Sequence, residues 1–361
     1  MKKPMKRVIS MLLIAVMVMA MIGCKKKEKE SDRIVTPEPT PTPAVTMEDL
    51  YEAQKKNTAK YTELIKTAYK DQKLTLPDIN SVIDVDLKGS FNLMDAYKVN
   101  LNFDTNADIT ASDNISHIIL DMLVDIAIND APIEEEDKTA KGEIYIDNTS
   151  EEVIRIYEKE EGKEWKLHEQ SFSELVGQIN QNVADAQTET PEEQKYFKDL
   201  DDFLKAHTVM EGEFGTFRNT TSFTLQEFHE YYKADFDAIL ADLSNSLTNG
   251  TGTLGSLAGD NSMGIDLSSM YGMIIGVVGE CFNSMSGDIK TVQEFDLDLE
   301  PTLMTMTVSN LSMGSQGDLK VSLNIENFSL KIENRKDKVK VTIPQDVINS
   351  AVPESDEVTG I

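Results

Sequence analysis

The sequence of 361 residues contains few of the side chains that build disulfide frameworks or compact metal sites: two cysteines, four histidines and one tryptophan. With only Cys24 and Cys281, the chain has no disulfide framework, and its hydrophobic core must hold the fold. Basic residues are scarce as well, because 35 Lys and Arg face 63 Asp and Glu, for a net charge of −28. This acidity argues against nucleic acid as a partner, since such binding neutralises phosphates with basic side chains.

Motifs for catalysis and cofactor binding are absent or incomplete. The sequence Gly250-x-Gly252-x-x-Gly255 matches the consensus of a dinucleotide-binding loop, but a predicted helix precedes it where that loop needs a strand. His229-Glu230 begins an HExxH zinc motif in which Lys233 replaces the second histidine. No serine lies in a G-x-S-x-G elbow. We therefore expect a non-catalytic protein without cofactor or metal, and an enzyme is the third hypothesis.

The first 24 residues are organised like a secretory signal. Residues 1–7 carry four positive charges and no acid, and residues 8–22 are almost entirely apolar. This run is shorter than the roughly 20 apolar residues of a spanning helix. Met21-Ile22-Gly23-Cys24 resembles the lipobox of bacterial lipoproteins. The resemblance implies that the Cys24 sulfur receives a diacylglyceryl group and that residues 1–23 are removed. The alternative is an uncleaved signal anchor with an incidental cysteine.

A linker over residues 24–45 would follow the lipidated cysteine. The three lysines at 25–27 would face lipid headgroups. VTPEPTPTPAVT at 35–46 favours extended polyproline II, so residues 25–45 would form a stalk of roughly 60 Å. Residues 1–23 contain four basic residues and no acid, so the mature chain has a net charge of −32. Solubility alone explains this charge, and recognition of a cationic partner is the alternative.

Residues 46–350 are expected to form one α+β domain. Helical spacing predicts a capped helix from Thr46 to about residue 72, and period-two alternation predicts long strands around 83–87, 99–103 and 120–128. Shorter strands, a helical middle over 171–285 and further strands follow. The short strands are expected at 142–147, 151–158 and 163–169; the helices at 172–186, 191–207 and 225–247, with a return to the sheet at 208–223; the last strands at 291–300, 302–313, 318–333 and 338–344. This order predicts a curved antiparallel β-sheet packed against several helices, with a flexible tail at 351–361.

The segment 269–279 is apolar almost all round, which is typical of a buried helix. A helix that lines or plugs an apolar ligand cavity is the alternative. Flexible methionines would suit such a cavity, and the candidate lining residues are Met270, Met273, Ile274, Val277, Met304 and Met306. Cys281 lies in the same helix and is expected to be an inert thiol.

The chain resembles the LolA/LppX-type half-barrel fold over roughly residues 46–350. Three features carry the resemblance: the capped helix before long alternating strands, the run YIDNTSEEVIRIYEKEEGKEWKLHE at 145–169, and a closing strand VKVTIPQDV at 339–347. The resemblance implies an open, strongly curved antiparallel sheet whose concave face is covered by helices and holds acyl chains. It transfers no ligand residue.

We expect a lipoprotein of a Gram-positive bacterium, anchored to the outer face of the plasma membrane through Cys24. The first hypothesis is that it binds a lipid or other apolar molecule between sheet and helices, with no covalent step. The second is a stalked surface module that recognises a protein or cell-wall partner through its acidic face, without catalysis.

Overall fold

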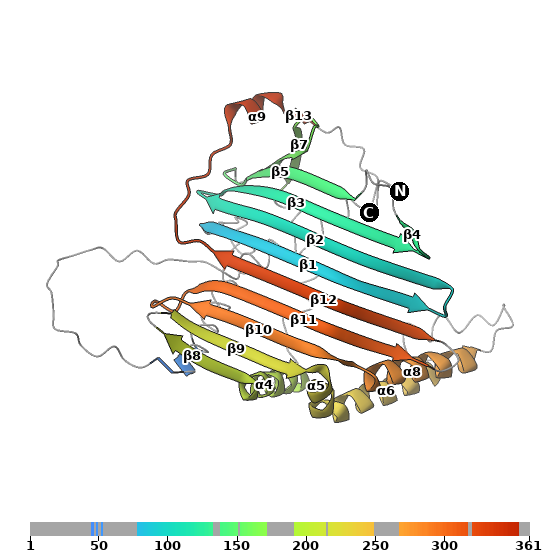
Figure 1. Ribbon diagram of the computed structural model, residues 1–361. Helices are drawn as coiled ribbons and strands as arrows, with labels where there is room; N and C mark the ends of the chain where they lie inside the picture. The colour runs from blue at the N-terminus through green and yellow to red at the C-terminus, as the bar shows by residue number, and fades with distance from the viewer. Residues whose placement is uncertain are drawn as a thin grey trace, which may run out of the picture.

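The computed structural model describes most of the chain after residue 77, in the ranges 45–46, 48–49, 52, 78–132, 138–150, 152–171, 191–213, 216–248, 267–316 and 320–353. A sheet of 13 strands dominates these residues (Figure 1). Its strands are β1 (Ile79–Leu93), β2 (Tyr97–Ser112), β3 (Ile115–Ile128), β4 (Ala131–Pro132), β5 (Thr139–Asp147), β6 (Val153–Glu160), β7 (Lys166–Ser171), β8 (Thr208–Glu213), β9 (Thr216–Thr224), β10 (Ser286–Phe295), β11 (Pro301–Ser315), β12 (Val321–Asn334) and β13 (Val352–Pro353). The helices are α4 (Pro191–Ala206), α5 (Leu225–Tyr231), α6 (Lys233–Thr248), α8 (Leu267–Asn283) and α9 (Gln345–Ser350).

Two antiparallel meanders build the sheet. The first runs from β1 through β2, β3, β5 and β6 to β7, and the second runs from β8 through β9, β10 and β11 to β12. They meet where β12 pairs with β1, while β4 forms a small hairpin with β3 and β13 pairs in parallel with β7. The sheet is curved and not closed. The expected α+β class is therefore confirmed, as are the three long strands and the return to the sheet after α4.

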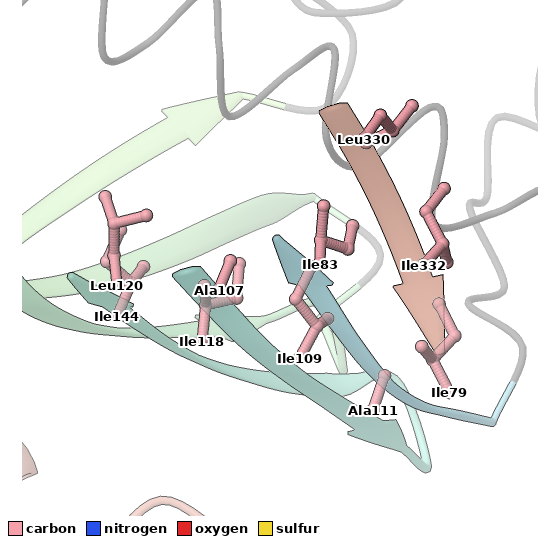
Figure 2. Packing of buried hydrophobic residues seen from close by; sticks show 10 residues of the cluster. All are labelled: Ile79, Ile83, Ala107, Ile109, Ala111, Ile118, Leu120, Ile144, Leu330 and Ile332. Atoms are coloured by element: carbon pink, nitrogen blue, oxygen red, sulfur yellow. The ribbon is translucent and has the colours of Figure 1, made fainter. Parts of the chain in front are cut away.

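One side of the sheet carries the main hydrophobic core. Ile83 on β1 is fully buried and lies opposite Ala107 on β2 and Ile332 on β12. Figure 2 shows that the buried side chains of this core project to the same side from β1, β2, β3, β5 and β12. Because strand side chains alternate between faces, every second residue of these strands belongs to this side. We call it the apolar face, and the opposite side the polar face.

The prediction of a closing strand at 339–347 is wrong, because this segment pairs with no strand among the described residues. It runs past the ends of the first meander to α9 and β13 (Figure 1). The Arg335 amide donates to the Asn80 carbonyl (2.7 Å) and the Val341 amide to Ser112 Oγ (2.7 Å). Val347 of α9 then packs on Tyr145, Tyr157 and Trp165. Val341 is buried and Ile343 packs on the aromatic cluster, whereas Val339 is exposed, so only part of the alternation reflects packing on one side of the segment.

Helices cover the far edge of the sheet, near β8 to β11 (Figure 1). Phe203 of α4 is 2% exposed and meets Phe223 of β9 edge-on, with ring centroids 5.1 Å apart. Thr224 and Glu227 form a capping box at the start of α5. The single helix predicted at 225–247 is interrupted, because Tyr232 ends α5 and α6 begins at Lys233. Tyr232 is buried against aromatic rings, which the break in the helix allows.

Two smaller expectations also need correction. Residues 296–300, predicted as the end of a strand, form the turn between β10 and β11. There Asp296 Oδ1 accepts hydrogen bonds from the amides of Asp298 (2.9 Å) and Glu300 (3.1 Å). Val352 and Pro353, assigned to the tail, form β13. Most of the first predicted helix, the helix at 172–186, residues 1–44 with Cys24, and the glycine-rich loop lie outside the described residues.

Candidate apolar ligand face

The apolar face continues well beyond the buried core, towards the end of the sheet that holds the β1–β2 turn. The registers of β12, β1, β2 and β3 align three rows of side chains across four strands. All positions in these rows are apolar side chains except one glycine. The rows are Phe328–Leu87–Phe103–Val124, Ile325–Gly89–Leu101–Ile126 and Leu323–Phe91–Val99–Ile128. We call these twelve positions the open half of the apolar face.

Burial divides the apolar face into two halves with different roles. The closed half consists of the buried core residues shown in Figure 2; among them, Ile83 is 0% exposed, and Ala107 and Ile118 are each 1% exposed. None of the open-half residues is buried, and Phe91 and Ile128 are exposed at 37% and 49%. Burial of apolar surface stabilises a fold in proportion to the area removed from water. The closed half therefore stabilises the fold, whereas the open half presents apolar surface that a ligand can still bury.

A β-bulge shapes the middle of the open half. The register between β1 and β12 shifts between Lys88 and Gly89, and Glu326 is the extra residue on β12. A Cβ at position 89 would lie 2.7 Å from the Asn324 carbonyl oxygen, so the close approach of β12 requires glycine there. Bulges increase local twist and re-aim side chains. Here the bulge leaves the middle row without a side chain on β1, between Ile325 and Leu101.

The dimensions of the open half suit an extended apolar chain. Four strands at the usual spacing of about 4.8 Å span roughly 14 Å. Three rows, two residues apart along each strand, extend over about 13 Å, and the flanking pair Leu93 and Tyr97 continues this surface along the strands. Two or three strand widths are enough to accommodate a hydrocarbon chain lying flat. No charged side chain lies among the twelve positions.

The polar face of the same strands is chemically different. It carries Asp and Asn side chains such as Asp86 and Asp104, which lie directly opposite each other on β1 and β2. Near the bulge, this face has a shallow hollow of about 230 Å³, lined among others by Lys88, Asn100 and Asn102. Ligand pockets for apolar molecules are usually larger and lined by apolar side chains. This hollow is therefore a poor site for an acyl chain.

Three of the residues predicted to line a cavity have described side chains: Val277, Met304 and Met306. Met304 and Met306 lie on β11 and pack against the core of the apolar face. Val277 lies on α8, one turn before Glu280, which accepts a hydrogen bond from the Gln316 amide after the far end of β11 (3.0 Å). Position 316 is ten residues beyond Met306, which corresponds to about 33 Å along a strand. The described residues therefore do not bring Val277 together with the two methionines.

The other predicted lining residues are Met270, Met273 and Ile274. They belong to α8, and their side chains lie outside the described residues. In the described part of α8, Val277 is half-buried and Gly276 is exposed, so this part is not a fully buried core helix. The cavity between α8 and the sheet stays a prediction.

The described residues offer no alternative chemical centre. No group of three His, Cys, Asp or Glu side chains within them is arranged to hold a metal ion. None of their helices has both the length and the apolar composition to cross a membrane. Burial raises the pKa of the Cys281 thiol, with a smaller contribution from Glu280, which disfavours the reactive thiolate at neutral pH.

Sequence reasoning missed the open-half residues as a candidate site. Alternation correctly predicted that Leu101 and Phe103 share one face of a strand, but it gave no information on which part of that face is buried. The register across the bulge was also invisible, although the isolated Gly89 in an apolar strand is a signal for a bulge or a close backbone approach.

Comparisons with known proteins add little to this geometry. No protein-family model and no curated protein sequence matches the chain. A distant neighbour among solved structures is the crystal structure of a beta-barrel-like protein of a domain of unknown function, DUF1849, from Brucella abortus. The two are 7% identical, with 72% of this chain and 99% of that chain covered and a TM-score of 0.14. So low a TM-score supports no conclusion about this chain, and the resemblance to the LolA/LppX type and to lipoproteins stays a prediction.

Proposed function

We propose that the protein is a lipoprotein of the outer face of the plasma membrane, held there by diacylglyceryl Cys24, and that it binds a lipid or other apolar molecule without catalysis. The single observation that carries the binding proposal is the open half of the apolar face. Twelve aligned positions without a charge remain accessible on a curved sheet whose other half is closed. The basic segment, apolar segment and Cys24 of the sequence support the anchor.

Binding would be sequestration by burial. Each buried methylene contributes about 0.8 kcal/mol, so burying about ten of them contributes about 8 kcal/mol before the cost of ordering the chain. That sum corresponds at best to about micromolar affinity. Such affinity suits a carrier or sensor that exchanges its ligand with a membrane.

A paired substitution tests the site. Leu101 lies in the open half, whereas Leu123 lies on the polar face of neighbouring β3 and is 38% exposed. In a chain of residues 46–361, Leu101→Gln should lower the affinity for a fluorescent fatty acid, because it places an amide in the middle row. Leu123→Gln makes the same chemical change on the other face and should leave the affinity unchanged.

Native mass spectrometry and solvent extraction of the unmodified chain complete the test. We expect an acyl species to co-purify or a fatty acid to be taken up. A chain that is free of such molecules and takes up none would contradict the binding proposal. The anchor is tested separately, because Cys24→Ser should abolish labelling of the full chain by radioactive palmitate.

The second candidate function is recognition of a cationic protein or cell-wall partner through the polar face. The direct pairing of Asp86 with Asp104 favours it, because like charges opposite each other in a sheet are destabilising. A cationic partner would relieve this repulsion. In that case a polycationic peptide should bind the chain in a salt-dependent manner, and Asp86→Asn with Asp104→Asn should weaken it. Salt-independent binding, or binding unaffected by both substitutions, would argue against this function.

A further inference from the structure

We propose that one end of the sheet is a bilayer-contacting rim, formed by Phe91, Met94, Tyr97 and Ile128. These side chains lie at the β1–β2 turn and at the end of β3, and they are exposed at 37%, 49%, 60% and 49%. Three of them, Phe91, Tyr97 and Ile128, belong to the apolar face or continue it by register. Apolar side chains gathered in this way mark a surface that binds a membrane or a protein.

Hydrogen bonds connect the segments that form the rim. The Met94 amide donates to the Lys320 carbonyl (2.7 Å), which joins the β1–β2 turn to the residue before β12. The Asn129 amide donates to the Lys98 carbonyl (2.7 Å), and the Lys98 amide donates to Asn129 Oδ1 (2.8 Å). Hydrogen bonds between neighbouring turns thus fix the apolar side chains in their exposed positions.

Met94 is not explained by the requirements of its turn. Met94 and Asp95 are the central residues of a turn closed by the hydrogen bond from the Ala96 amide to the Leu93 carbonyl (3.1 Å), and their φ values of 54° and 55° are those that Asn and Gly adopt most easily. The two-residue turn after β3 has Asn129 and Asp130 with positive φ. Bulky residues with positive φ are uncommon because they are sterically disfavoured. A methionine that is both disfavoured by the backbone and half-exposed points to a role outside the fold.

Charge allows the rim to approach a membrane. Lys98 lies 3.5 Å from Asp130, and Lys320 lies 3.6 Å from Asp95, so these four charges form two ion pairs without net charge. The whole chain, by contrast, has a net charge of −28. Tyrosine and lysine are suited to the membrane interface, because each has an apolar body and a polar end. The two ion pairs beside the rim therefore add no net negative charge that would repel anionic lipids.

The position of the rim favours a bilayer over a protein as its partner. Phe91 and Ile128 belong both to the rim and to the last row of the open half. An apolar molecule that passes between bilayer and sheet at this end would avoid crossing water. The inference rests on the proposed membrane anchoring, and the choice of a bilayer over a protein also draws on the proposed ligand binding.

Site-specific photo-crosslinking in the full chain tests the rim. Tyr97→p-benzoylphenylalanine places the photo-reactive group in the rim. The control is Leu297→p-benzoylphenylalanine, because Leu297 is 66% exposed and lies in the β10–β11 turn at the opposite end of the sheet. The chain is illuminated in phosphatidylcholine vesicles containing phosphatidylglycerol, and adducts are identified by mass spectrometry. We expect phospholipid adducts at position 97 and only background at position 297.

Three results would overturn the inference: no phospholipid adduct at position 97, equal adducts at both positions, or protein adducts at position 97 in native membranes. Illumination of the detergent-purified chain separates the rim from a ligand on the apolar face, because adducts that persist equally without a bilayer come from bound ligand and also count against the rim. A failed ligand-uptake test with bilayer-dependent adducts would refute the binding proposal alone.

Met94→Glu provides a second measurement, since it should reduce the adducts at position 97 several-fold.

Discussion

Replacing Ile83 and Leu101 by alanine in separate variants tests the division of the apolar face into two halves. Ile83 is fully buried between Ala107 and Ile332, whose strands are held by hydrogen bonds on both sides. The strands cannot close around the space that the missing side chain leaves, so we expect a loss of about 2–5 kcal/mol in the free energy of unfolding. Leu101 is only half-buried, so its truncation should cost about 1 kcal/mol.

Urea unfolding of residues 46–361 measures both losses. A domain of this size should have a slope near the upper end of about 1–3 kcal/mol per molar urea, so Ile83→Ala should lower the midpoint by about 1–2 M. The corresponding shift for Leu101→Ala should stay below about 0.5 M. Fatty-acid binding without urea should show the reverse order, because Leu101→Ala removes ligand contacts whereas folded Ile83→Ala keeps them.

The stability result alone is sufficient to refute the reasoning. If Leu101→Ala destabilised the chain as much as Ile83→Ala, the open half would be part of the folding core and not an available surface. Equal slopes in urea are the required control, because a changed slope would report a change in the denatured or native ensemble and not in the packing of one side chain.

Two further predictions concern the bulge and a buried phenol. Gly89→Ala should destabilise the fold, because its Cβ would meet the Asn324 oxygen at 2.7 Å, whereas Gly276→Ala on α8 has open space and should gain up to about 1 kcal/mol; equal melting temperatures would contradict this contrast. Burial, and then the hydrogen bond to Glu143, raise the pKa of Tyr145 to about 12. The stabilisation that the protonated Tyr145 side chain provides should be complete below pH of about 10 and lost as the pH rises towards 12. Tyrosinate absorbance should show that Tyr145 ionises after the exposed tyrosines. Tyr145→Phe should remove that late step.

The sequence predicted the elements of the fold better than their surroundings. Alternation identified β1, β2 and β3, because a strand with one dry and one wet face leaves a period of two. The same period wrongly suggested a strand at 339–347. There Val341 is buried and Ile343 packs on the aromatic cluster of Tyr145, but the backbone bonds to Ser112 and not to a strand. A period of two in the sequence indicates that side chains of one parity are packed. It does not show that the backbone pairs with another strand.

The candidate site could not be predicted from the sequence for a different reason. The methionines at 304 and 306 were sensible candidates by composition, but composition does not say that they join the core or that α8 meets the opposite end of β11. The positions that remain accessible depend on register, curvature and the bulge at Gly89. These are relations between segments far apart in the chain, and local periodicity does not contain them.

The strongest reason to regard the open half as functional comes from strand β2. Asn100 and Asn102 on its polar face and Leu101 and Phe103 on its apolar face are all half-buried. The two faces of this strand are thus similarly exposed, but one carries polar and the other apolar side chains. The degree of exposure alone does not explain this difference. A polar residue at position 101 would cost the fold little, because the site is not sealed from water. Leucine and phenylalanine at these positions contribute most when something else completes their burial, which is the role that the proposed apolar ligand would have.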